Sequence, residues 1–131
     1  MHFENIDPFE IDNGQIVRLV KNIVQSENGI CGEISIILCS DVFLADINRK
    51  YLGRDYLTDI ITFDYSGEGI VSGDLFISFE RVSENAVSYN VTAEEELRRV
   101  IIHGVLHLLG YKDEAEQEKQ KMKEMEDFYL K

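Results

Sequence analysis

The chain has 131 residues and a formal net charge of −12 at pH 7, with 44% hydrophobic and 29% charged residues. This composition is ordinary for a globular protein that builds one core without disulfides, so we expect a single domain over residues 1–131. No stretch approaches the roughly 18 apolar residues of a membrane-spanning helix, and the acidic first residues lack the features of a secretory signal. The negative charge works against nonspecific attraction to a polyanion, so composition alone does not suggest a nucleic-acid partner.

The two cysteines, Cys31 and Cys39, lie eight residues apart. This spacing matches neither a metal-binding CxxC pair nor a disulfide framework. We interpret both as small buried residues in a reducing compartment, and we expect a cytoplasmic protein with no disulfide partner and no membrane partner.

The first half of the chain shows alternating strand and helix patterns. Apolar residues recur at helical spacing up to Ser26, where Asn28-Gly29 predicts a stop. The next segment is rich in β-branched residues, and Ser40 or Asp41 after it can cap a helix. The expected elements are a weak edge strand, a helix, a strand and a second helix, over residues 2–6, 13–26, 33–39 and 40–52.

The second half continues with two strands and three helices. We expect the strands over 60–65 and 74–79, with Gly67, Gly69 and Gly73 in the loop between them. The expected helices cover 80–90, a segment opened by the capping box at 92–95, and 114–129. This order predicts an α+β domain in which helices cover one face of a small mixed sheet.

The run HGVLHLLGYKD at 103–113 is the most informative stretch. Two histidines four residues apart on a helix project about 40° from one another, so His103 and His107 can reach one ion. Gly110 can adopt the left-handed conformation that ends a helix and folds the chain back. Asp113 then falls where its carboxylate can complete a set of three ligands. Three protein ligands with one position for water is typical of a catalytic zinc site, so we predict one zinc ion per chain.

A simpler interpretation of each residue stays open. A histidine on an apolar helix face is often a buried, hydrogen-bonded core residue, and Asp113 can be a turn or capping residue. The chain has only three histidines, however, so this pairing does not reflect a histidine-rich composition.

HGVLHLLGY resembles the signature of the YbeY family of bacterial metal-dependent endoribonucleases, which reads His-Gly-x-Leu-His-Leu-x-Gly-Tyr-Asp-His. Two upstream blocks, at 47–63 and 73–77, are similar to further segments of that family and occur in the family order. The resemblance implies a four- or five-stranded sheet with helices mainly on one face. It also implies cleavage of single-stranded RNA in ribosomal RNA maturation, at the 3′ end of small-subunit rRNA, and in ribosome quality control. The implied partners are single-stranded ribosomal RNA and ribosomal particles.

The chain departs from the family pattern at two places. Lys112-Asp113 stands where the family has Asp-His, so the third ligand is a carboxylate, which zinc also accepts. The family arginine after the tyrosine is Leu52 here, and Arg54 is the nearest cation. We therefore expect Arg54 to be a catalytic residue, and Arg49 and Lys50 to bind substrate.

The residue after the first histidine separates the possible activities. In HExxH peptidases that position holds the glutamate that activates water, whereas here it is Gly104, which cannot transfer a proton. We therefore favour RNA cleavage. The alternatives are a zinc-dependent, peptidase-like hydrolase and a non-enzymatic ribosome-assembly factor with a structural metal.

Overall fold

The computed structural model describes residues 2–4, 13–53 and 58–131. Its elements, in chain order, are β1 (His2–Glu4), α1 (Asn13–Ser26), β2 (Ile30–Cys39), α2 (Asp41–Leu52), β3 (Ile60–Asp64), β4 (Ile70–Ser78), α3 (Phe79–Tyr89), α4 (Ala93–Leu108) and α5 (Glu116–Leu130). The predicted α+β class is confirmed. In the described part of the chain, no helix is long and apolar enough to cross a membrane.

The sheet is mixed, with the strand order β1-β2-β4-β3. Three longer strands make most of it: β2 and β4 are parallel, and β3 is antiparallel to β4. The three-residue β1 adds to the outer edge of β2 in parallel. Among the described strands, the two edges of the sheet are therefore β1 and β3. Residues of β3 face the histidines near the end of α4.

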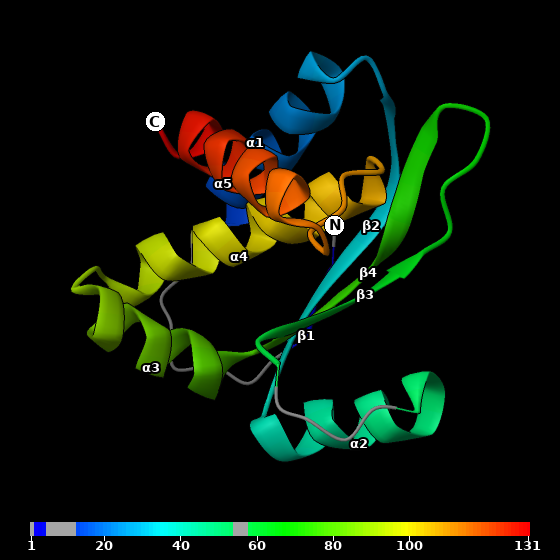
Figure 1. The fold of residues 1–131 in the computed structure, drawn as a ribbon. Helices are drawn as coiled ribbons and strands as arrows, with labels where there is room; N and C mark the ends of the chain where they lie inside the picture. Colours follow the sequence, from blue (N-terminus) through cyan, green and yellow to red (C-terminus); the bar gives the residue numbers. More distant parts are fainter. Residues whose placement is uncertain (1, 5–12, 54–57) are drawn as a thin grey trace.

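Helices cover the two faces of the sheet unequally (Figure 1). On one face, α1, α4 and α5 enclose the main core, which includes Ile36, Leu75 and Ile101 with no exposed surface. On the other face, α2 packs through Leu44 and Ile47 against a smaller cluster. Helices therefore lie mainly on one face, with α2 as the exception.

The start and middle of α4 show why this helix lies so close to the sheet. The Thr92 hydroxyl accepts a hydrogen bond from the Glu95 amide at 3.1 Å, which confirms the predicted helix start. Gly104 leaves room for the sheet, because a Cβ there would lie 2.8 Å from Ile60 Cδ1 and 3.0 Å from Leu75 Cδ1. This close approach brings the last turns of α4 next to β3.

One expectation about the glycines was wrong. Gly73 lies inside β4 rather than in the loop before it. A Cβ at this position would collide with the Phe63 carbonyl and lie 2.6 Å from Leu108 Cδ2, so the strand needs glycine where α4 crosses it. The turn itself is shorter, with Gly67 and Ile70 paired and Gly69 at φ +79°.

Candidate metal centre

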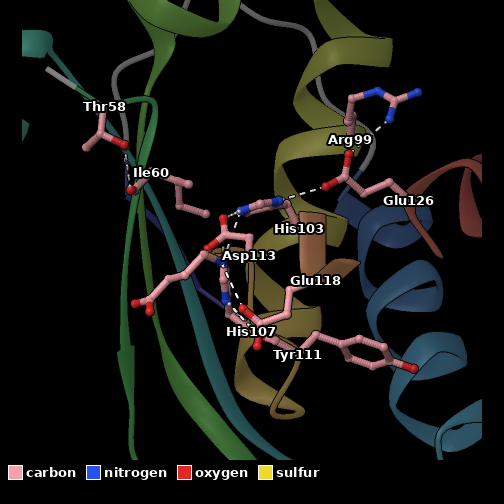
Figure 2. A network of polar contacts seen from close by, with 10 residues as sticks. Thr58, Ile60, Arg99, His103, His107, Tyr111, Asp113, Glu118 and Glu126 are labelled. Atoms are coloured by element: carbon pink, nitrogen blue, oxygen red, sulfur yellow. Dashed lines mark hydrogen bonds and ion pairs between the residues drawn. The ribbon is translucent and has the colours of Figure 1, made fainter. Parts of the chain in front are cut away.

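His103, His107 and Asp113 converge on one point, as the sequence predicts. The Nε2 atoms of the two histidines are 3.0 Å apart. Asp113 Oδ2 lies 3.3 Å from His103 Nε2 and 3.4 Å from His107 Nε2. Among the described residues, these three form a group of possible metal ligands whose donor atoms all lie within 4.8 Å of one another. Figure 2 shows the two rings and the carboxylate directed toward one another.

These spacings suit a small tetrahedral cation. Ligand atoms about 2.0–2.1 Å from a tetrahedral zinc ion lie about 3.3–3.4 Å from one another. The separations of 3.0, 3.3 and 3.4 Å are close to that triangle before any adjustment. The donor set of two imidazole nitrogens and one carboxylate oxygen also fits zinc.

The end of α4 explains how Asp113 reaches the histidines. Gly110 has φ +102°, and its amide donates to the His107 carbonyl at 3.0 Å. The Tyr111 amide donates to the Leu106 carbonyl, also at 3.0 Å. This pair of bonds is the Schellman ending of a helix, which turns the chain back along the helix it has just left. The predicted role of Gly110 is therefore confirmed.

Each imidazole is held by an oxygen on its other nitrogen. His103 Nδ1 lies 2.7 Å from Glu126 Oε2, and His107 Nδ1 lies 2.9 Å from the Tyr111 carbonyl oxygen. Because a carbonyl accepts only, His107 donates from Nδ1 and its neutral ring has a lone pair on Nε2. The same arrangement at His103 would leave two lone pairs and a carboxylate oxygen facing one another. A cation between them relieves that repulsion.

The surroundings of the site are acidic. Burial lowers the pKa of His103. The hydrogen bond and charge of Glu126, together with the charges of Asp113 and Asp59, raise this pKa by a larger amount, so the net shift is upward. Burial raises the pKa of Asp59, although the charge of His103 opposes this shift. Burial, followed by the charge of Asp59, raises the pKa of Glu96 to about 7. Such a group of acids favours a bound cation.

Two clefts meet at this cluster. One, of about 650 Å³, extends from His103 and Asp113 along β3 to Asp59 and to Leu52 at the end of α2. The other, of about 640 Å³, runs from the same two residues between α4 and α5, past Arg99. A ligand in the cleft along β3 therefore reaches all three converging residues, whereas a ligand between α4 and α5 reaches His103 and Asp113.

The described cations that were predicted to act on substrate do not lie beside the three converging residues. Arg49 and Lys50 lie in the last turn of α2, exposed, and pair with Asp46 at 3.5 and 3.2 Å. The structure does not bring either of them into the two clefts. Arg54 lies outside the described residues. Leu52, which occupies the position of the family arginine, does line the cleft along β3.

Sequence reasoning missed three acidic residues near the site. Asp59 falls in a segment that was matched only as part of a family block, and Glu96 was hidden among the glutamates that open α4. Glu126 was hidden in the highly charged α5, although it follows the buried Met122 by one helical turn. That spacing was the one signal available.

Comparisons with known proteins agree with the motif. A family model described as Endoribonuclease YbeY matches residues 2–131. A protein of Flavobacterium psychrophilum named Endoribonuclease YbeY is 48% identical, over 94% of this chain and 89% of that protein. One of Bacteroides thetaiotaomicron with the same name is 42% identical, over 95% and 90%. The solution structure of a Thermotoga maritima protein has a TM-score of 0.71 and 29% identity, covering 98% of this chain and 85% of that one. The chain belongs to the endoribonuclease YbeY family.

Proposed function

We propose that this protein is a zinc-dependent endoribonuclease that cuts single-stranded RNA, with His103, His107 and Asp113 as ligands of one zinc ion. The observation that carries the proposal is the convergence of three donor atoms at the junction of two clefts. Membership of a family named for endoribonuclease activity supports RNA as the substrate.

The residues of the chain have separate roles in this proposal. His103 and His107 offer neutral nitrogens, and the carboxylate of Asp113 adds a negative charge that balances part of the ion's charge. When bound, zinc would supply a Lewis acid for a phosphoryl oxygen and a water of lowered pKa. Asp59, in the cleft along β3, is placed to accept a proton from a water there.

Single-stranded RNA suits the clefts better than a duplex. A flexible strand can enter a cleft of about 650 Å³ and expose its backbone to the ligand cluster, whereas a rigid A-form helix presents its phosphates over a broad surface. Within this proposal, Arg54 contacts the phosphate near the metal, and Arg49 and Lys50 bind the backbone farther along. The exposure of Arg49 and Lys50 leaves them accessible to RNA.

We place this activity in ribosomal RNA maturation, at the 3′ end of small-subunit rRNA, and in ribosome quality control in the cytoplasm, with ribosomal particles as partners. This setting rests on the family resemblance alone. A peptidase is disfavoured by Gly104, which packs against Ile60 and Leu75 and leaves no acid at that position.

The experiment uses metal-free protein reloaded with one equivalent of zinc. It is given a fluorogenic single-stranded RNA, the same RNA as a duplex, and a fluorogenic peptide library. We expect cleavage of the single strand only, and its loss in His103→Ala. Peptide cleavage would support the hydrolase alternative. Silence in all assays, together with co-sedimentation with ribosomal particles, would support an assembly factor with a structural metal.

The role of Arg54 has its own test. Arg54→Ala should lower RNA cleavage while zinc content stays at one per chain, and Arg54→Lys should restore only part of it, because an ammonium cannot grip two phosphate oxygens. Wild-type cleavage by both variants would show that Arg54 has no part in the reaction.

A further inference from the structure

Glu126 is a charged side chain in a place where an apolar one is expected. The buried positions of α5 are Met122, Glu126 and Tyr129, which form one stripe along the helix. Only 9% of Glu126 is exposed. A carboxylate loses favourable hydration when it is buried, and an apolar residue in the same stripe would not. The contacts of Glu126 must therefore compensate for that loss.

Each carboxylate oxygen of Glu126 has its own partner. Oε2 lies 2.7 Å from His103 Nδ1, and Oε1 accepts from Arg99 Nη1 at 3.0 Å. The other terminal nitrogen of Arg99 donates to Asp127 Oδ1 at 2.8 Å. The result is a row of contacts, Asp127–Arg99–Glu126–His103, which joins α5 to the histidine-bearing face of α4. Figure 2 shows the part of this row from Arg99 to His103.

The contact with His103 decides which ring nitrogen is available to a metal. A neutral imidazole carries its proton on one nitrogen and a lone pair on the other. A carboxylate oxygen that accepts at Nδ1 keeps the proton there and leaves the Nε2 lone pair directed at His107 and Asp113. Without this acceptor, the ring can carry its proton on Nε2 instead, where it would block a cation.

We propose that Glu126 is a positioning residue of the metal centre: it fixes the orientation and the Nδ1–H tautomer of His103, and Arg99 in turn fixes Glu126. This inference rests on the proposed metal site.

Docking of α5 on α4 does not explain the contact between Glu126 and His103. Arg99 already joins the two helices through Asp127, and a carboxylate that served only to dock α5 would have no need of His103. The two histidines also differ. His107 is held by the Tyr111 carbonyl, which belongs to the backbone and is set by the end of α4. His103 has no such backbone acceptor among the described contacts, so a side chain from another helix supplies one.

The first test measures zinc affinity by competition with a chromophoric chelator. Glu126→Gln keeps the shape of the side chain and removes its charge, and we expect zinc to bind about ten- to hundredfold more weakly. Glu124→Gln makes the same change of charge at an exposed position of α5, and its affinity should stay within about twofold of the wild type. Glu126→Met, which completes the apolar stripe and leaves Arg99 its contact with Asp127, is a second variant; circular dichroism checks that it is folded, and its zinc affinity should fall as well.

The second test needs no metal. Long-range proton–nitrogen NMR spectra of the metal-free protein at alkaline pH report which nitrogen of each histidine carries the proton, and the chain has only three histidines. We expect His103 to carry it on Nδ1 in the wild type and to shift toward Nε2 in Glu126→Met, while His107 stays unchanged. Unchanged zinc affinity in both Glu126 variants, or an Nε2–H tautomer of His103 in the wild type, would overturn the proposal. A wild type with the expected tautomer that binds no zinc would overturn the metal site instead.

Discussion

The two sides of the sheet treat their charged residues in opposite ways. Near the end of α4, the polar atoms of His103, Asp113 and Glu126 lie close together, and the side chain of Glu126 is nearly buried. On α2, the charges of Arg49 and Lys50 point into solvent and are balanced locally by Asp46. The first group converges on one point and fits a bound cation, whereas the charges of α2 are balanced within the helix and stay accessible from solvent.

The difference follows from how each helix is packed. The buried face of α4 meets the sheet, α1, α3 and α5, so side chains near its end have few alternative positions. The short apolar face of α2 rests on a small cluster and leaves its last turn exposed. Rigid surroundings favour a preorganised metal site, and an exposed turn favours adaptable contacts with a flexible strand.

Removing a metal ligand on α4 should have the largest effect on zinc affinity and on RNA cleavage. We expect His107→Ala to lower zinc affinity more than about hundredfold and to abolish RNA cleavage, because the loss of a direct ligand exceeds that of a supporting residue. The helical fold should survive, as circular dichroism can check. Stoichiometric zinc in this variant would mean that the ion binds elsewhere.

A smaller effect should follow at the third ligand. Asp113→Ala should weaken zinc binding by at least about tenfold, because the two histidines still hold the ion. Asp113→His, which restores the residue found in the family motif, should bind zinc close to wild-type affinity. If zinc content at limiting metal is the same in all three proteins, Asp113 is only a turn residue.

The close packing of α4 on the sheet can be tested without metal. In Gly104→Ala the new methyl group would lie 2.8 Å from Ile60 Cδ1, so we expect the free energy of unfolding to fall by about 1–3 kcal/mol. Gly67→Ala is the matched control, since nothing lies within 4 Å of its Cβ position. Equal stabilities in chemical denaturation would contradict the tight contact between α4 and the sheet.

The burial of acids near the site should give the metal-free protein a characteristic pH dependence. Glu96 titrates near 4.5 in an unfolded chain and at about 7 in the fold, chiefly because burial disfavours its charge. The folded state therefore holds this proton more tightly, so its contribution to stability is present below pH 4.5 and is lost as pH rises to about 7. Glu96→Gln should remove this loss and be more stable than wild type by about 1–3 kcal/mol above pH 7. Parallel stability curves for the two proteins would contradict the burial of this charge.

The smallest effects are expected on α2. Arg49→Ala and Lys50→Ala should each change the free energy of unfolding by less than about 0.5 kcal/mol, since exposed ion pairs contribute little. Each should weaken RNA binding modestly and lower its dependence on salt by about one phosphate contact. Zinc affinity should not change. A large loss of zinc affinity in either variant would contradict the claim that α2 has no part in metal binding.

The sequence predicted those parts of the site that depend on local geometry. The spacing of His103 and His107 and the helix-ending Gly110 are properties of one short segment, so its pattern sufficed. Glu126 lies on a different helix, 23 residues beyond His103, and only the packing of α5 on α4 brings the two together. Gly73 was misplaced for the same reason, because its contact with Leu108 comes from tertiary packing.

The most direct test of the central proposal follows RNA cleavage as zinc is added to metal-free protein. The rate of single-strand cleavage should rise in proportion to bound zinc, reach a plateau at one equivalent, and stay at background throughout the same titration of His107→Ala. Full activity of the metal-free protein, or an equal rise in His107→Ala, would show that His103, His107 and Asp113 do not form the metal centre of this enzyme.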